Sequence, residues 1–191
     1  MTRIVAGFAG SLTLAVPKAG TRPTSDRVRE AIFSALEARD AVRGARVLDL
    51  YAGSGALGLE AASRGARVVT LVEKSYGASQ LCRKNADAIL RAAPKGDSLK
   101  IRVSGQPVQA FLAGTPDGFD LVFLDPPYDL GEPELAQNLA ALTPLLSEDA
   151  LVLVERSSRS PEPTWGPGLE LERRKDYGDT TVWTATPAPP A

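Results

Sequence analysis

The chain has 191 residues, a length typical of one domain. Its 22 basic and 23 acidic residues give a net charge of −1, which excludes a polycation that coats nucleic acid through bulk charge. The chain has no histidine and one cysteine, Cys82, which excludes Ser-His and Cys-His nucleophile pairs, His-ligated metals and internal disulfides. We therefore expect no metal site, and the single cysteine suits a cytoplasmic protein.

The N-terminal segment is apolar and is predicted to form a hairpin. Residues 4–16 carry no charge and follow Arg3, which is the general form of a signal peptide. Two glycines within residues 7–10 interrupt the run and favour a β-hairpin with strands Arg3–Ala6 and Ser11–Leu14. No apolar stretch approaches the roughly 18 residues of a membrane span, so we expect no membrane association.

A helix is expected after a loop at Pro17–Thr24. Ser25 or Thr24 can cap it, and Asp26 in its first turn favours the positive end of the helix dipole. Apolar residues at three- and four-residue spacing predict that this helix extends to about Ala38.

Short apolar runs then alternate with helical segments along the rest of the chain. The predicted strands are 47–51, 67–73, 99–103, 120–125 and 150–155, followed by a terminal hairpin of 169–178 and 180–186. The predicted helices between them are 56–64, 75–90, 107–113 and 133–142. This alternation predicts an α/β fold with a mostly parallel sheet covered by helices on both faces. We expect an extension at 1–24, one domain at 25–186 and a flexible tail at 187–191.

The segment Val47–Gly58 reads VLDLYAGSGALG and places a glycine-rich turn between a strand and a helix. Glycine lets the backbone turn sharply and approach a ligand without a Cβ in the way. Glu73 follows Gly53 by 20 residues, at the end of the next strand, where a carboxylate can accept hydrogen bonds from both ribose hydroxyls. These features together predict a nucleoside-binding site.

The same glycine pattern also fits a dinucleotide, whose pyrophosphate binds at the helix N-terminus. Asp49 lies four positions before Gly53, and its negative charge repels a pyrophosphate but attracts a cationic or amino-bearing ligand. S-adenosylmethionine carries both a sulfonium and an amino group, so we favour it as the cofactor. The D-x-x-x-G-x-G arrangement resembles the first motif of the class I methyltransferases, which have a Rossmann-like fold.

The tetrapeptide Asp125-Pro126-Pro127-Tyr128 follows a predicted strand, at the edge where open α/β sheets bind ligands. Two successive prolines fix φ and remove two backbone donors, which leaves the Asp125 carboxylate and the nearby carbonyls as acceptors in a rigid loop. Such acceptors match the two protons of an exocyclic amino group, and Tyr128 offers a face on which a base can stack. The tetrapeptide is thus predicted to orient a nucleobase amine for methyl transfer without a covalent enzyme intermediate.

The motif [DN]-P-P-[YF] resembles that of methyltransferases acting on adenine N6, cytosine N4 or guanine N2. From about residue 3 to residue 184 the chain is similar to the bacterial 16S rRNA guanine-N2 methyltransferase D family. The segments that carry the resemblance are RIVAG at 3–7 and residues 22–36, 48–66, 72–85, 121–128 and 177–180.

The resemblance implies methyl transfer from S-adenosylmethionine to guanine N2 of 16S rRNA, in the 30S subunit or its assembly intermediate, and we expect a monomer. The predicted catalytic residues are Asp125, Pro126, Pro127 and Tyr128. The predicted cofactor-binding residues are Asp49, Tyr51, Ala52, Gly53, Ser54, Gly55, Glu73, Lys74, Gly105 and Gln106. The loop after the third strand lacks the acidic residue that many class I relatives use against adenine, so Gln106 or a backbone amide is expected to replace it.

Basic residues gather near the N-terminus, where residues 1–30 have a net charge of +3. A basic segment beside a base-binding site can supply phosphate contacts while the pocket reads the base. The predicted RNA-binding residues are Arg3, Lys18, Arg22, Arg27 and Arg29. The target guanine must be unstacked to reach the methyl group, which favours an unpaired base.

Three other functions stay open on the sequence alone. A DNA adenine-N6 methyltransferase would use the same motifs, although only the small N-terminal hairpin is available for target recognition. An NAD-dependent oxidoreductase would use the same glycine turn, but it lacks an obvious catalytic histidine or Lys-Tyr pair. A non-catalytic RNA-binding module would bind rRNA and transfer nothing.

Overall fold

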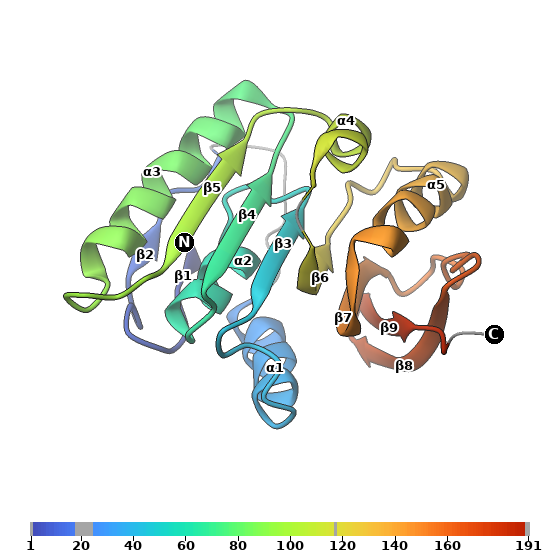
Figure 1. Ribbon diagram of the computed structural model, residues 1–191, viewed down its shortest axis with the longest axis horizontal. Coiled ribbons are helices and arrows are strands. Elements are labelled where there is room, and N and C mark those ends of the chain that lie inside the picture. The colour runs from blue at the N-terminus through green and yellow to red at the C-terminus, as the bar shows by residue number, and fades with distance from the viewer. Residues whose placement is uncertain (1, 18–24, 117, 190–191) are drawn as a thin grey trace.

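The computed structural model describes residues 2–17, 25–116 and 118–189, and within them a seven-stranded sheet forms the centre of the molecule (Figure 1). Its strands are β3 (Arg46–Leu50), β4 (Val68–Val72), β5 (Lys100–Ser104), β6 (Phe119–Leu124), β7 (Leu146–Ser157), β8 (Leu169–Tyr177) and β9 (Thr180–Pro187). They lie in the order β5-β4-β3-β6-β7-β9-β8. The first five of these are mutually parallel, and β9 is antiparallel to both β7 and β8. The predicted fold class, including the C-terminal antiparallel hairpin, is confirmed.

Helices cover both faces of this sheet. They are α1 (Asp26–Glu37), α2 (Ala56–Ser63), α3 (Tyr76–Ala92), α4 (Val108–Gly114) and α5 (Glu132–Leu142), with a short 3-10 helix at Thr143–Leu145. The helix predicted from Asp26 begins there, and the Ser25 hydroxyl accepts a hydrogen bond from the Val28 amide at 3.3 Å. The strand predicted at 150–155 is longer than expected, because β7 continues past an irregularity in its pairing with β6.

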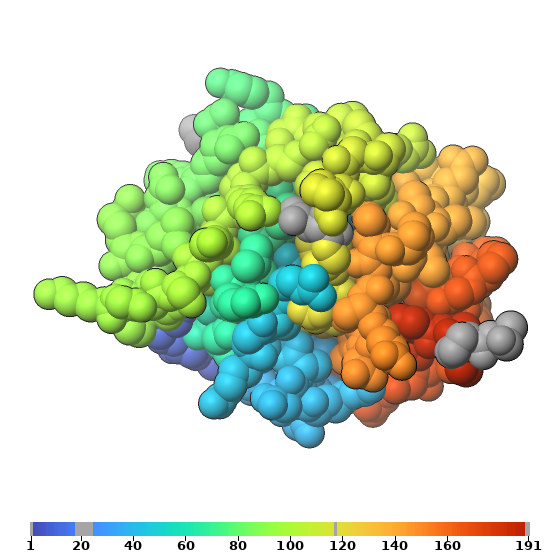
Figure 2. Space-filling view, viewed as in Figure 1, coloured from blue at the N-terminus to red at the C-terminus, as the bar shows by residue number. Residues whose placement is uncertain are grey.

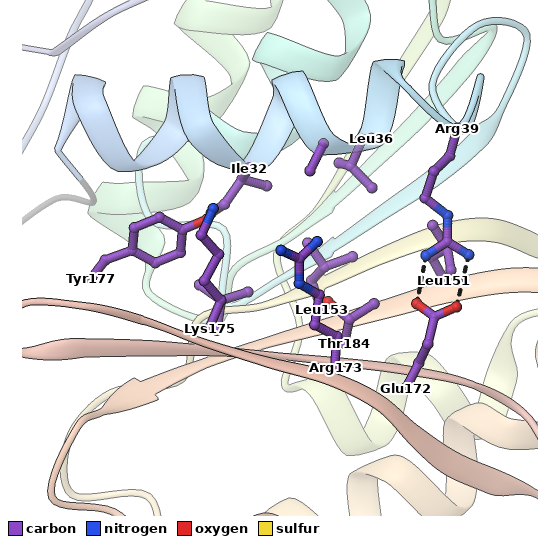
Figure 3. A pocket seen from close by; sticks show the side chains of 12 residues that line it. Ile32, Leu36, Arg39, Leu151, Leu153, Glu172, Arg173, Lys175, Tyr177 and Thr184 are labelled. Atoms are coloured by element: carbon purple, nitrogen blue, oxygen red, sulfur yellow. Dashed lines mark hydrogen bonds and ion pairs between the residues drawn. The ribbon is translucent and has the colours of Figure 1, made fainter.

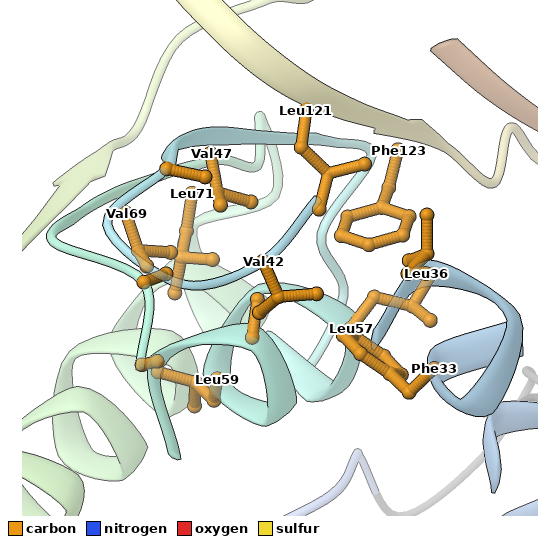
Figure 4. Packing of buried hydrophobic residues seen from close by; sticks show 14 of the residues in the cluster. Phe33, Leu36, Val42, Val47, Leu57, Leu59, Val69, Leu71, Leu121 and Phe123 are labelled. Carbon is orange, nitrogen blue, oxygen red and sulfur yellow. The ribbon is translucent and has the colours of Figure 1, made fainter. Parts of the chain in front are cut away.

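The alternation of side chains along the strands divides the core into two layers. One layer joins α1, α2 and α3 to sheet residues such as Val47, Leu71 and Phe123 (Figure 4). The other layer joins α4 and α5 to Leu48 and Val122, which are the neighbours of such residues along the same strands. Both faces of the central strands are therefore buried, which explains why these strands read as continuous apolar runs.

The N-terminal hairpin forms with shorter strands than predicted, β1 (Thr2–Arg3) and β2 (Thr13–Leu14), which pair antiparallel. Backbone hydrogen bonds continue the pairing as far as Ile4, whose amide donates to the Leu12 carbonyl at 2.9 Å, and the next residues contact helix α2. The Val5 and Ala6 amides donate to the buried Glu60 carboxylate at 2.7 and 3.0 Å. The sequence predicts that these two amides belong to a strand, but in the structure the side chain of Glu60 on α2 accepts their hydrogen bonds. The division into an extension at 1–24 and a domain at 25–186 stays a prediction.

The two edges of the sheet are formed by β5 and β8. Strand β8 is mostly exposed, and all of its exposed residues are charged: Glu170, Glu172, Arg173, Arg174, Lys175 and Asp176. Figure 2 shows that the C-terminal strands, coloured orange to red, lie on the side of the molecule away from α3, which is green. Within the described ranges, no helix is both long enough and apolar enough to span a bilayer.

Gly58 allows helix α2 to lie close against the sheet. A Cβ at this position would lie 2.4 Å from Leu71 Cδ2 and 3.1 Å from Asp49 Cβ. We expect Gly58→Ala to lower the free energy of unfolding by about 1–3 kcal/mol, because a filled core must shift to accept a methyl group. Urea denaturation would measure this. Gly114→Ala is the control, since nothing lies within 4 Å of a Cβ there, and an equal loss in both variants would contradict the packing argument.

Candidate active site

The glycine turn and the Asp125 tetrapeptide leave the sheet side by side. Leu50, the last residue of β3, pairs with Leu124, the last residue of β6, and the Asp125 amide donates to the Leu50 carbonyl at 3.5 Å. The chain runs outward from β3 to β4 and β5, then returns to β6 on the other side of β3. Such a reversal of strand order opens a crevice at the carboxyl ends of the strands, where α/β proteins bind ligands.

The glycine turn has a backbone that favours glycine. Gly53 and Gly55 have φ of 57° and 82°, and Tyr51 before them has φ of 63°. A Cβ at Gly55 would lie 2.9 Å from Leu71 Cδ1, whereas a Cβ at Gly53 would meet nothing within 4 Å. Gly55 therefore faces the core, and the face of Gly53 is open for a ligand.

Glu73 lies against this turn. Its two carboxylate oxygens accept hydrogen bonds from the Gly53 amide at 3.0 Å and the Ser75 amide at 2.8 Å. Each oxygen keeps a further lone pair for a hydroxyl group. The Glu73 amide donates to the Ser104 carbonyl at 3.0 Å, which brings the exposed residues Gly105 and Gln106 to the same rim. The half-buried Glu73 carboxylate fits the ribose of S-adenosylmethionine, and the open face of Gly53 beside it leaves room for the rest of the cofactor. Ala52 and Ser54 belong to the same turn, and Lys74 is exposed next to Glu73.

Asp49, whose negative charge is predicted to attract the cofactor, is buried beneath the glycine turn. Its side chain is 1% exposed, and its carboxylate accepts a hydrogen bond from the Gly58 amide at 2.8 Å. Burial raises the pKa of Asp49 to about 7, against the effect of this hydrogen bond. The carboxyl group therefore holds the start of α2 beneath the glycine turn.

The raised pKa of Asp49 predicts a pH-dependent stability. In the unfolded chain the Asp49 carboxyl group loses its proton near its ordinary pKa of 3.8, whereas in the folded state it keeps the proton up to a pKa of about 7. The stability that this group contributes is therefore fully present below pH 3.8 and is lost as the pH rises through about 7. We expect the free energy of unfolding of Asp49→Asn to fall less than that of the native chain between pH 4.5 and 8, as measured by urea denaturation. Parallel curves for the two proteins would contradict this.

Helix α3 supports the turn from behind with two buried residues. The Cys82 thiol donates to the Gly53 carbonyl at 3.0 Å, and the side-chain amide of Asn85 donates to the Ser54 carbonyl at 2.8 Å. Burial raises the pKa of Cys82 to about 12, so the thiol stays protonated and can donate. Asn85 also accepts from the Ala15 amide at 2.8 Å and donates to the Ala15 carbonyl at 2.9 Å. The sequence reasoning missed Asn85, which connects the end of the hairpin to the turn.

The Asp125 tetrapeptide borders a hollow of about 60 Å³. The hollow is lined by the end of β7, the start of β9 and the segments that follow β6 and β7: Asp125, Pro126, Tyr128, Glu155, Arg156, Ser157, Ser160 and Thr180. Tyr128 is 78% exposed, so its ring is accessible for stacking. The sequence reasoning missed Glu155 and Arg156. Their signal is a pair of charged residues at the end of the buried run ALVLV, on the strand next to β6.

A network of polar side chains holds the surrounding loops. Arg156 donates to the Leu130 carbonyl at 3.0 Å and to the Glu132 carboxylate at 2.6 Å. From α5, the side-chain amide of the buried Asn138 donates to the Tyr51 hydroxyl at 2.6 Å. Burial raises the pKa of Tyr51 to about 12, so it stays a neutral phenol. Helix α5 thereby fixes both the loop after the tetrapeptide and the first residue of the glycine turn.

The predicted RNA-binding residues separate into three groups. Arg27 is exposed, and Arg3 is exposed and paired with Asp26 at 3.1 Å. The prediction for Arg29 is wrong, because its side chain is 1% exposed and donates to the Arg3 carbonyl and to Asp26, both at 2.6 Å. Its burial and these hydrogen bonds make it an internal support of the hairpin. Lys18 and Arg22 lie outside the described residues.

A second hollow of about 60 Å³ lies between α1 and the β8–β9 hairpin (Figure 3). Its floor is aliphatic, with Leu36 and Leu153, and Arg39 closes one end through a hydrogen bond to Glu172 at 2.9 Å. None of the predicted site residues lines it. The crevice at the carboxyl ends of β3, β6 and β7 is therefore the candidate active site.

Sequence comparison identifies the family. The family described as Conserved hypothetical protein 95 matches residues 2–186. The chain belongs to this family. Among curated relatives, the chain is 40% identical to ribosomal RNA small subunit methyltransferase D of Escherichia coli, over 92% of this chain and 85% of the relative. The protein of the same name in Haemophilus influenzae is 35% identical, over 83% of this chain and 80% of the relative.

Solved structures share the fold of this chain. A hypothetical protein from Thermus thermophilus is 32% identical, with a TM-score of 0.78 over 96% of this chain and 98% of that chain. Magnesium protoporphyrin IX methyltransferase of Synechocystis PCC 6803, solved with bound SAM, has a TM-score of 0.65 at 14% identity over 88% of this chain and 87% of that chain. The chain therefore has the fold of these two structures.

Proposed function

We propose that this chain transfers a methyl group from S-adenosylmethionine to the exocyclic N2 of a guanine in 16S rRNA. The observation that best supports this proposal is that the glycine turn and the Asp125 tetrapeptide lie next to each other, at the ends of the paired strands β3 and β6. A cofactor held at the first lies next to an amine held at the second. The names of relatives that are 35–40% identical support small-subunit rRNA as the substrate. We propose that the 30S subunit or its precursor is acted on by a monomer.

The cofactor would be held by residues of the turn and by Glu73. The open face of Gly53 accommodates the methionine part, and the Glu73 carboxylate accepts hydrogen bonds from the ribose hydroxyls. When bound, the cofactor supplies an electrophilic methyl group on a sulfonium. Lys74, Gly105 and Gln106 border the same rim, where a side chain or a backbone amide can contact the adenine.

The tetrapeptide would position the attacking amine. The Asp125 carboxylate and the Pro126 carbonyl accept the two amino protons, which favours a pyramidal nitrogen with its lone pair directed at the methyl carbon. Tyr128 stacks on the base. A bond forms between nitrogen and the methyl carbon as the bond between carbon and sulfur breaks, and the nitrogen then releases a proton. Arg3 and Arg27 are exposed cations that would contact phosphates.

Methyl transfer from labelled S-adenosylmethionine tests the proposal. The acceptors are unmethylated 30S subunits, naked 16S rRNA and duplex DNA, and the labelled nucleoside is identified after digestion. N2-methylguanosine in either rRNA sample is expected, and the sample that carries it shows whether assembly is required. Label in DNA adenine, or no label in any acceptor despite cofactor binding, would overturn the proposal.

A further inference from the structure

Two acidic residues line the hollow beside the tetrapeptide. The pairing of β6 with β7 ends at Leu124 and Val154, and the next residue on each strand is acidic, Asp125 on β6 and Glu155 on β7. Both residues line the same hollow. The methyl-transfer step described above uses only one of them.

The alternation of the strands places both carboxylates on one side of the sheet. Phe123 pairs with Leu153, and both belong to the core layer that contains α1. Side chains two residues apart on a strand share a face, so Asp125 and Glu155 continue this side. Neighbouring strands of a sheet lie about 5 Å apart, and Asp125 and Glu155 follow the last pair of the parallel strands β6 and β7. This spacing matches two neighbouring groups on the edge of a single base.

Arg156 occupies the other side of β7. Arg156 is 8% exposed, and its guanidinium donates to the Leu130 carbonyl and to the Glu132 carboxylate. The cation is therefore held by the loop after the tetrapeptide. Asp125 and Glu155 are the acidic residues that line the hollow, and an ionised carboxylate can only accept hydrogen bonds.

The Watson–Crick edges of the nucleobases differ in the atom next to the amino group. Guanine has a donor, N1–H, beside its N2 amino group. Adenine has the unprotonated N1 beside its N6 amino group, and cytosine has the unprotonated N3 beside its N4 amino group. A carboxylate at this place attracts guanine and repels the lone pair of the other two. Assuming the proposed function, we infer that Glu155 accepts the guanine N1–H while Asp125 holds the N2 amino group, which makes Glu155 the residue that selects guanine over adenine and cytosine.

Base analogues separate this role from a structural one. Once the methylated guanine is mapped, 16S rRNA is ligated with guanosine, 6-thioguanosine or 2-aminopurine at that position, in the assembly state that the native enzyme accepts. All three bases carry the 2-amino group, but 2-aminopurine lacks the N1 proton. The native enzyme is expected to methylate guanosine and 6-thioguanosine at rates within about fivefold, and 2-aminopurine about 100-fold more slowly or worse, since a site built to bond a polar group strongly rejects analogues that lack it.

Variants of Glu155 test whether its side chain causes the preference for guanosine over 2-aminopurine. Glu155→Gln can donate to an unprotonated N1, so its preference for guanosine over 2-aminopurine is expected to fall to about fivefold or less. Glu155→Asp keeps the carboxylate and is expected to keep most of the preference at a lower rate. Glu148→Gln is the matched control, because Glu148 is exposed on the same strand at its opposite end, and it is expected to match the native enzyme. Affinity for S-adenosylmethionine, measured by calorimetry, reports whether each variant is folded.

The outcomes distinguish the role of Glu155 from the proposed methyl transfer itself. Equal methylation of guanosine and 2-aminopurine by the native enzyme would overturn the inference without affecting the proposed function. An unchanged preference in folded Glu155→Gln would also overturn it. Absence of N2-methylguanosine from the native reaction would instead overturn the proposed function, and the inference with it.

Discussion

Asp125→Ala is expected to slow methyl transfer about 1,000-fold or more while affinity for S-adenosylmethionine changes by less than about threefold. The carboxylate belongs to the acceptor side of the crevice, whereas the glycine turn and Glu73 belong to the cofactor side, so the loss falls on the chemical step. Single-turnover transfer of labelled methyl groups and calorimetric titration of the cofactor measure the two quantities separately.

The effect of Asp125→Ala has two matched comparisons. Asp125→Asn keeps one acceptor oxygen, and the motif [DN]-P-P-[YF] admits it, so the loss is expected to be only about tenfold. Asp149→Ala removes an exposed aspartate from the far end of β7 and is expected to leave transfer unchanged. Native activity in Asp125→Ala, or a loss of cofactor binding equal to the loss of rate, would contradict the assigned role.

Glu60→Ala is expected to lower the free energy of unfolding by about 3 kcal/mol. Glu60 is fully buried and accepts hydrogen bonds from the Val5 and Ala6 amides and from the Arg64 guanidinium at 2.7 Å. Its removal leaves these donors without their acceptor and detaches the N-terminal hairpin from α2. For a chain of this size the loss corresponds to a fall in Tm of about 6–12 °C, measurable by calorimetry.

The matched control for Glu60 is Glu37, which binds the same guanidinium. Its carboxylate accepts from Arg64 at 3.0 Å, but the side chain is 48% exposed, so Glu37→Ala is expected to cost about 1 kcal/mol or less. Equal losses in the two variants would show that the pairing with Arg64, and not the capture of the hairpin amides, provides the stability.

The sequence was sufficient to predict the order of strands and helices, because buried parallel strands are apolar along their whole length and helices repeat every three to four residues. It was also sufficient to predict that the glycine turn and the Asp125 tetrapeptide follow strands. Their adjacency depends on the pairing of β3 with β6, which is a long-range property. The same limit explains why Glu155 was missed, since its importance depends on the register between β6 and β7.

Two predictions depended on burial, which a local pattern does not reveal. Arg29 and Asp49 are charged residues and were assigned to ligands, but both are 1% exposed and bind backbone groups. Arg29 supports the hairpin that contains Arg3, and Asp49 supports the turn that contains Gly53. The hairpin strands were predicted too long because Glu60, distant in sequence, captures two of their amides.

The charged character of β8 has a consequence for assembly. An outermost strand presents unpaired backbone groups that another chain can extend into a larger sheet, which is a route to aggregation. Along β8 the exposed side chains include Arg173, Arg174 and Lys175, and the opposite outermost strand, β5, carries the exposed Lys100 and Arg102. Exposed acidic residues such as Glu172 and Asp176 lie among them on β8, so a second copy approaching either border would have to desolvate charged side chains. The molecule thus protects a sheet that is open at both ends against uncontrolled growth.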